Sequence, residues 1–516
     1  MNIEAPSILE LQSRMRAGEL TACAVCEQYL ARIEALDVQG PALNSVIELN
    51  PDALKIAQAL DDERKLGKLR GPLHGIPVLL KDNIATGDGM QTTSGSLALQ
   101  GRHAARDAFL VKRLRAAGMV VLGKTNLSEW ANFRGRRSIS GWSSRGGLTR
   151  NPYALDRTAS GSSSGSAVAV AASLCSVAVG TETDGSIISP SQITGIVGIK
   201  PTLGLVSRSG IIPIAHSFDT AGPMARSVAD AAMLLGALTG VDARDSASAG
   251  SARHLQNDYA PFLDRAGLRG ARIGVARDMV GNDARVLEIF ERSLDVLRQQ
   301  GAVLIDPVAV PNFNRLGAAQ LEVMLHEFKA GLNAYLATPV RRTLPALPAQ
   351  QSTRSRIRTL ADVIAFNQAH ADQVMPYFGQ ELLLAAQAKG SLSSKLYRAA
   401  LATCRKLSRR EGIDVPMKQQ RLSAIVFPSG GPAWLVDPVH GDASSWRGGS
   451  TTAAAVAGYP HITVPAGYVC GLPVGMSFIA KAWQEPTLIK FAYAFEQATL
   501  VRTAPTFLEG SRYLRK

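Results

Sequence analysis

The chain has 516 residues, of which 46% are hydrophobic and 19% charged, a balance that excludes a largely disordered protein and allows a large buried core. The 56 basic and 42 acidic residues leave a net charge of +14, but the bases are spread along the chain and aromatic residues do not alternate with them as stacking platforms would. We therefore interpret the charge as a solvated basic surface and expect no nucleic-acid partner.

No stretch is apolar for long enough to cross a bilayer, since the most apolar run, residues 167–180, is short and contains Ser173 and Ser176. Glu4 stands where a secretory signal peptide would have basic residues. We expect no membrane association and a cytoplasmic location. The five cysteines are too few and too scattered for a disulfide framework, and we interpret the CxxC of Cys23 and Cys26 as free thiols in a helix.

The first 70 residues predict a layer of helices. Ile8, Leu11 and Met15 recur at helical spacing, and a second helix is expected from Thr21, a favourable N-cap residue, to about residue 36. A third helix is expected after Pro51. Nothing in this segment carries recognisable chemistry.

From residue 71 the pattern changes to short apolar runs separated by glycine, with helical patterns between them. The apolar runs are residues 76–80, 120–122, 177–180 and 196–199, and the helical patterns are residues 108–117 and 166–174. This alternation predicts an α/β fold, with a sheet covered by helices on both faces. We expect residues 71–240 to form the catalytic core, ending in a helix at residues 228–238.

The rest of the chain predicts one further mixed segment and the completion of the sheet. Strands are expected at residues 273–276, 303–305, 424–427, 461–465 and 474–479. Residues 311–420 are mostly helical and less patterned. The predicted plan is a single domain over residues 1–516, in which residues 241–420 are a helical, pocket-shaping region and residues 421–516 complete the sheet.

Two clusters of serines, one at residues 160–166 and the other ending at Ser186, are candidates for nucleophilic chemistry. The chain has no GxSxG motif, and none of its eight histidines lies in a recognisable triad motif. His74 is the only histidine close in sequence to a candidate site, and we interpret it as structural.

Lys81 is a candidate base because it ends the apolar run GIPVLL. A lysine can replace histidine if burial keeps it neutral, although a lysine at the end of a strand is more often a surface charge. The neighbouring Asp82 is expected to point to the opposite face of the strand and therefore not to pair with Lys81.

The glycines and serines of the two clusters are also consistent with other roles. Gly185 allows a tight turn that can aim successive N–H groups inward, as an oxyanion hole requires. The loop at residues 161–166 opens a helix, so it is consistent with an N-cap or with an anion site. A phosphate-binding P-loop is disfavoured because the lysine and hydroxyl residue that follow its glycine are missing.

Together these segments resemble the amidase signature family. The matching segments, in order, are GIPVLLKDN at 75–83, GSSSGSAVAVAA at 161–172, GTETDGSI at 180–187, GIVGIKPT at 195–202, GYPHITVPAG at 458–467 and GLPVG at 471–475. The resemblance is strong over residues 7–240 and 421–485. It implies the amidase signature fold, with a mixed central sheet, and an amide hydrolase that uses no metal or organic cofactor.

The resemblance also implies the roles of individual residues. Ser186 would be the nucleophile, Ser162 the bridging serine, and Lys81 the base, with a cis peptide bond expected around Ser162 and Ser163. The backbone N–H groups of the oxyanion hole would be those of Thr183, Asp184, Gly185 and Ser186. Ser163 and Asp184 are further candidates for substrate binding.

The chain departs from the common family pattern at Ser160, Ser164 and Asp184, where glycine is usual. The extra carboxylate of Asp184 is expected to influence the charge of the substrate. With EWANFRGRRSISGWSSRGG at 129–147 and LADVIAFNQAH at 360–370, these variants resemble the peptide amidase branch, which removes the C-terminal amide of peptides as ammonia.

Three alternatives remain open. The first is an amidase of aryl or fatty acylamides. The second is the transamidating subunit that works on charged transfer RNA, which would need partner subunits and would give the basic charge a function. The third is an amidase-like protein that only binds ligands. The sequence indicates neither the oligomeric state nor the side-chain preference of the substrate, because we expect the pocket walls to come from the less patterned residues 311–420 and from the loop around Trp434 to Trp446.

Overall fold

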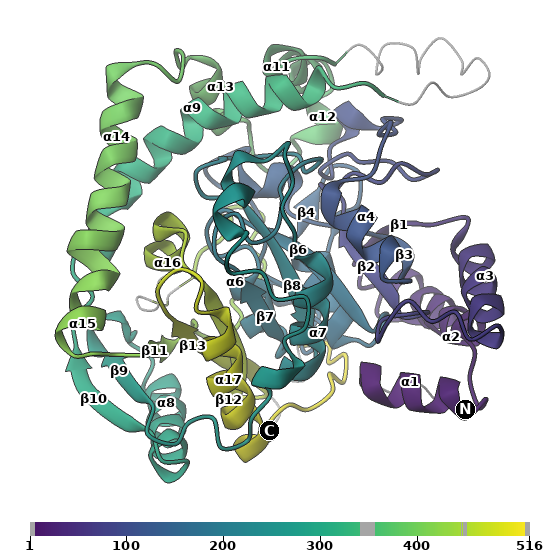
Figure 1. Ribbon diagram of the computed structural model, residues 1–516. Helices are drawn as coiled ribbons and strands as arrows, with labels where there is room; N and C mark the ends of the chain where they lie inside the picture. Colours follow the sequence, from purple (N-terminus) through teal and green to yellow (C-terminus); the bar gives the residue numbers. More distant parts are fainter. Residues whose placement is uncertain (1–5, 341–356, 445, 447–450, 511–516) are drawn as a thin grey trace.

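The computed structural model describes residues 6–340, 357–444, 446 and 451–510 of the chain. Its centre is a mixed sheet of 11 strands with helices on both faces, which confirms the predicted fold class (Figure 1). The strands are β1 (Val46–Leu49), β2 (Pro77–Lys81), β3 (Val120–Thr125), β6 (Val177–Glu182), β7 (Val197–Lys200), β8 (Thr220–Ala225), β9 (Arg272–Ala276), β10 (Val303–Val308), β11 (Ala424–Pro428), β12 (His461–Val469) and β13 (Leu472–Ile479). A separate ribbon pairs β4 (Trp142–Ser143) with β5 (Gly147–Leu148).

The helices surround this sheet. They are α1 (Ile8–Arg16), α2 (Ala22–Arg32), α3 (Ala53–Lys65), α4 (Phe109–Ala116), α5 (Ser164–Ala171), α6 (Ile188–Ile193), α7 (Val228–Leu238), α8 (Ala284–Gln299), α9 (Gly317–Leu336), α11 (Leu360–Ala369), α12 (Ala371–Val374), α13 (Glu381–Gln387), α14 (Lys395–Arg405), α15 (Asp414–Gln419), α16 (Thr452–Ala457) and α17 (Glu485–Thr499). Within the described ranges, no helix is both long and apolar enough to span a bilayer.

The strand order is β1-β3-β2-β6-β8-β7-β12-β13-β11-β9-β10. Strand β2 lies between β3 and β6 and is parallel to both, with Leu79 opposite Ala178 in β6. Because the carboxyl ends of parallel strands meet at one edge of a sheet, the ends of β2 and β6 bring Lys81 and Thr181 to the same place.

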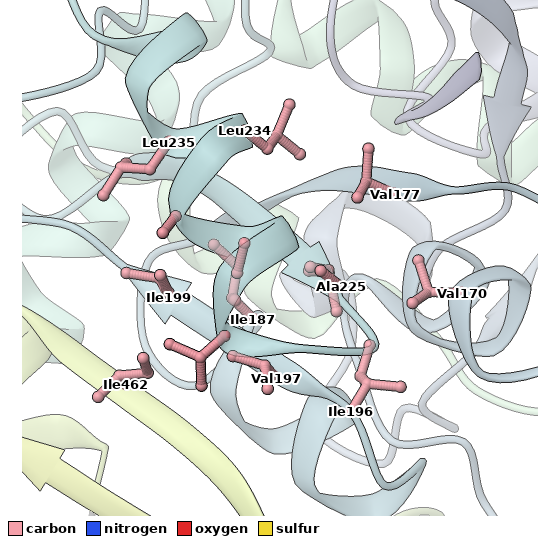
Figure 2. Close-up of a cluster of buried hydrophobic side chains, with 14 of the residues drawn as sticks. Val170, Val177, Ile187, Ile196, Val197, Ile199, Ala225, Leu234, Leu235 and Ile462 are labelled. Carbon is pink, nitrogen blue, oxygen red and sulfur yellow. The ribbon is translucent and has the colours of Figure 1, made fainter. Parts of the chain in front are cut away.

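The main apolar core lies between the sheet and the helices packed on it. Figure 2 shows part of it, in which Val170 of α5, Val177 of β6, Ala225 of β8 and Leu235 of α7 belong to one cluster of buried side chains. Most of α5 and the whole of β6 are buried, which explains why their sequences lack the polar alternation of a surface element.

The sheet corrects the predicted plan in two places. The first 70 residues are not purely helical, because β1 pairs antiparallel with β3 as an edge strand. Strand β8, which the sequence does not predict, lies between β6 and β7 and is antiparallel to both. Its sequence, TAGPMA, contains few residues of high strand propensity, so its conformation is set by its two neighbours.

The strands β9 and β10, both predicted, place part of segment 241–420 in the sheet rather than in the helical region. The described part of residues 311–420 is mostly helical, as predicted, while residues 341–356 lie outside the described ranges. Figure 1 shows α9, α11, α13 and α14 as an arch along one side of the sheet. We call residues 313–340 and 357–405 the helical arch, and its apolar side chains form a second cluster with Trp130.

Candidate active site

Lys81 lies at the carboxyl end of β2 and its side chain is completely buried. Its Nζ lies 2.6 Å from Ser162 Oγ, 3.0 Å from Ser163 Oγ, 3.0 Å from Thr181 Oγ1 and 3.2 Å from the Thr181 carbonyl oxygen. Burial penalises the ammonium form and lowers the pKa of Lys81 to about 7, against the opposing attraction of Glu182 and Asp219. At neutral pH a large fraction of this lysine is therefore an uncharged amine.

Asp82 points away from Lys81, as predicted. Its carboxylate accepts hydrogen bonds from the Thr93 hydroxyl and, at 3.1 Å, from the Gly95 N–H, and it forms an ion pair with Arg145 at 3.4 Å. The lysine is thus left among hydroxyl groups, which do not stabilise its charged form as a carboxylate would.

Ser162 is fully buried, and the peptide bond between Gly161 and Ser162 is cis. A side chain at Gly161 would meet Ser128 Oγ at 2.2 Å, so the loop passes Ser128 closely enough that a larger residue would displace its hydroxyl. Ser163, the residue after Ser162, links this loop to the second serine cluster, because its N–H donates to the Ser186 carbonyl oxygen at 3.1 Å. The structure therefore brings Lys81, Ser162 and Ser186 together from three separate motifs.

Ser163 is one of the residues that hydrogen-bond to Lys81. Its hydroxyl accepts from Lys81 and donates to the Thr181 carbonyl oxygen at 3.0 Å, and its side chain is fully buried. The contacts that the structure gives Ser163 are with protein groups, and its contact with substrate stays a prediction.

Residues 183–186, which we call the nucleophile turn, follow β6. Gly185 has φ +79°, a conformation that favours glycine, and Ser186 follows with 7% of its surface exposed. Beyond the turn, the N–H groups of Ile187 and Ile188 donate to Glu182 at 2.7 and 3.0 Å. Among the residues that the structure describes, the N–H groups of Thr183, Asp184, Gly185 and Ser186 have no acceptor, which is consistent with their predicted place in an oxyanion hole.

The side chain of Thr183 is tied to Asp219, a carboxylate that sequence reasoning missed. The Thr183 hydroxyl donates to Asp219 at 2.6 Å, and the N–H groups of Ile214 and Ala215 donate to the other carboxylate oxygen at 2.9 Å. Burial raises the pKa of Asp219 to about 6. No sequence signal separates Asp219 from other acidic residues, because its partner lies 36 positions away.

The carboxylate of Asp184 is also paired within the protein. It accepts from Thr451 Oγ1 at 2.6 Å, Thr452 Oγ1 at 2.7 Å and Gln320 Nε2 at 2.9 Å. Three neutral donors from α9 and from the start of α16 therefore hold this carboxylate, and its influence on the charge of the substrate stays a prediction.

A cavity of about 340 Å³ lies next to the hydroxyl groups that hydrogen-bond to Lys81. Thr181 and Thr183 contribute to its wall, and Ala334 and Tyr335 of α9 close it on another side. Residues of the helical arch therefore line a pocket that also borders Thr181, one of the hydrogen-bond partners of Lys81.

His74 is structural, as predicted: its ring is buried and Nε2 lies 2.8 Å from the Leu60 carbonyl oxygen. Cys23 and Cys26 are free thiols, Cys26 being buried. In the part of the chain that the structure describes, no group of three or more His, Cys, Asp or Glu side chains is placed to hold a metal ion.

Comparison with known proteins agrees with this geometry. Residues 24–489 match the amidase family. The chain is 40% identical to a probable amidase of Arabidopsis thaliana, over 98% of this chain and 92% of that protein. It is 34% identical to a glutamyl-tRNA(Gln) amidotransferase subunit of Symbiobacterium thermophilum, over 98% of this chain and 100% of that protein.

Among solved structures, the native peptide amidase from Stenotrophomonas maltophilia superposes with a TM-score of 0.90 and 52% sequence identity, over 98% of this chain and 99% of that chain. The family match spans most of the sequence and contains every residue of the candidate site. The chain therefore belongs to the amidase signature family and is an amide-hydrolysing enzyme.

Proposed function

We propose that the protein hydrolyses the C-terminal amide of peptides and releases ammonia, with Ser186 as nucleophile, Ser162 as bridging serine and Lys81 as base. The observation that carries the proposal is the 2.6 Å hydrogen bond between Lys81 Nζ and Ser162 Oγ in a buried site. The likeness to the peptide amidase of Stenotrophomonas maltophilia supports the choice of substrate.

In the acylation half of the reaction, neutral Lys81 takes the hydroxyl proton of Ser162 while Ser162 takes that of Ser186. Ser186 Oγ then attacks the amide carbon and a C–O bond forms. The N–H groups of the nucleophile turn stabilise the oxyanion. As the C–N bond breaks, the proton returns from Lys81 through Ser162 to the leaving nitrogen, which departs as ammonia.

In the deacylation half, water replaces the departed ammonia. The same relay removes a proton from the water, whose oxygen attacks the acyl carbon and releases the peptide carboxylate and Ser186. Lys81 suits both halves because a pKa of about 7 lets it accept and return a proton near neutral pH.

The experiment that tests the proposed substrate is the hydrolysis of a panel of peptide amides, unmodified peptides, aryl acylamides and fatty acylamides, followed as ammonia for primary amides and as the released amine for the other substrates. We expect peptide amides to be hydrolysed at the highest kcat/KM. If none of them releases ammonia while an aryl or fatty acylamide is cleaved, the peptide amide assignment is overturned and the family assignment stands.

A second candidate is the transamidating function, which the full-length match to a glutamyl-tRNA(Gln) amidotransferase subunit favours. That function would require partner subunits and contact with transfer RNA. Co-purification of partners together with salt-sensitive RNA binding would support it over the peptide amidase. For the peptide amidase we propose a cytoplasmic location and no nucleic-acid partner. Cell fractionation tests the location, and an RNA-binding assay tests the partner.

A further inference from the structure

The carboxylate of Asp184 joins three segments of the chain that are far apart in sequence. Thr451 donates to Oδ1, whereas Thr452 and Gln320 donate to Oδ2. Thr452 is the first residue of α16, Thr451 directly precedes it, and Gln320 lies in the first turns of α9. The nucleophile turn is thereby fastened to the helical arch and to the C-terminal part of the fold.

The turn is held at two successive residues just before the nucleophile. Thr183 is bound to Asp219 on one side, and Asp184 is bound to the three donors on the other. At the next residue, an added side chain on Gly185 would come within 2.9 Å of Thr451 Oγ1, so α16 also packs directly against the turn.

An oxyanion hole works only if its donors point to where the charge develops, because they must not reorganise during the reaction. The N–H groups of Asp184, Gly185 and Ser186 belong to a turn with a glycine at its centre, which is intrinsically free to adopt other conformations. The side-chain contacts of Thr183 and Asp184, at the start of the turn, restrict that freedom. The backbone alone supplies the donors, but the side chains fix their direction.

We propose that Asp184 is a positioning residue, whose carboxylate, held by Gln320, Thr451 and Thr452, fixes the direction of the oxyanion-hole N–H groups. This inference deepens the proposed function and rests on it. It assigns to the carboxylate a role inside the protein instead of a contact with the substrate.

The test is the rate at which a fluorophosphonate labels Ser186, because this reaction uses the nucleophile and the oxyanion hole and needs no knowledge of the natural substrate. Asp184→Ala keeps the backbone N–H and removes the anchor. We expect labelling and kcat to fall by roughly 10- to 100-fold, less than the 10²–10³ lost when an oxyanion donor is removed outright. KM for a hydrolysed amide should change by no more than about 2-fold, since the carboxylate does not touch the substrate.

The double variant Thr451→Val/Thr452→Val removes two donors from the other side of the same contacts with little change of shape. We expect it to slow labelling as well, and the combination with Asp184→Ala to be no slower than Asp184→Ala alone, as for residues that act through one contact. If Asp184→Ala does not fold, the threonine variant still decides the matter, since it retains the carboxylate.

Glu327→Gln is the matched control. Glu327 is a buried carboxylate that likewise accepts from three donors, the N–H and hydroxyl of Ser217 and the hydroxyl of Tyr397, but it is not bonded to the nucleophile turn. We expect this variant to lower the Tm without changing the labelling rate.

Labelling of Asp184→Ala or of the threonine variant at the wild-type rate would overturn the inference, as would fully additive effects in the combined variant. If wild-type Ser186 itself is not labelled, the proposed function fails and takes this inference with it. The two failures are therefore distinguishable.

Discussion

The loops at the carboxyl ends of β2 and β6 and the helical arch contribute to one pocket but are built differently. Around Lys81 the contacts are polar, short and buried, and they involve serine, threonine and backbone oxygen. The arch is held mainly by apolar packing, such as that of Trp130 against Phe328, with ring centroids 6.5 Å apart. In the proposed function the loops perform the chemistry while the arch encloses it, and the hydrogen bond from Gln320 to Asp184 is a polar link between them.

The largest effect should come from removing the reacting groups on the loop side. Ser186→Ala and Lys81→Ala should each reduce kcat for amide hydrolysis by about 10⁴-fold or more, because the members of a catalytic triad act as a unit. Circular dichroism and the Tm should show that both variants remain folded. Near-normal ammonia release by either variant would contradict the proposed roles.

The pH dependence of hydrolysis tests the electrostatics around Lys81, on the loop side of the comparison. Because Lys81 must be neutral to accept a proton and its pKa is lowered to about 7, kcat/KM should be low in acid and rise as the pH increases through about 7. The nearby Asp219 carboxylate favours the ammonium form, so Asp219→Asn should shift this rise to lower pH. A profile that is flat between pH 6 and 8, or a shift to higher pH, would be inconsistent with Lys81 as the base.

The arch should show the opposite behaviour, with an effect on stability and little on chemistry. Leu332 of α9 is completely buried in the second apolar cluster. Leu332→Ala should lower the free energy of unfolding by about 2–5 kcal/mol, through lost burial and the cavity left behind. Denaturant unfolding measures this loss, and fluorophosphonate labelling of Ser186 under native conditions should stay within about 3-fold of wild type. A larger loss of labelling would mean that the arch takes part in positioning the nucleophile.

The sequence predicts much of the site because its key residues lie in continuous segments. The apolar run before Lys81 predicts both strand β2 and the position of the lysine at its end. The hydrogen-bond partners that surround the buried amine, however, lie on other segments, among them Thr181, 100 positions away. From the residues alone, a surface charge and a buried base were therefore both possible, and only the family resemblance favoured the base.

The parts that sequence reasoning missed depend on contacts between distant segments. The partners of Asp184 lie 136, 267 and 268 positions away, so its sequence neighbours cannot reveal them. Strand β8 is similar, since its conformation is set by pairing with β6 and β7 and not by its own residue types. The family resemblance, carried by continuous motifs, predicted the proposed reacting groups, and tertiary contacts determine what holds them.

The most direct test of the central claim is to map the covalent adduct formed by a fluorophosphonate on wild-type protein and on Lys81→Ala and Ser162→Ala, by digestion and mass spectrometry. The account predicts a single adduct on Ser186 of the wild type, formed at least about 10²-fold more slowly in both variants because the relay that activates Ser186 is broken. An adduct on another residue, or labelling of Ser186 in the Lys81→Ala variant at the wild-type rate, would contradict it.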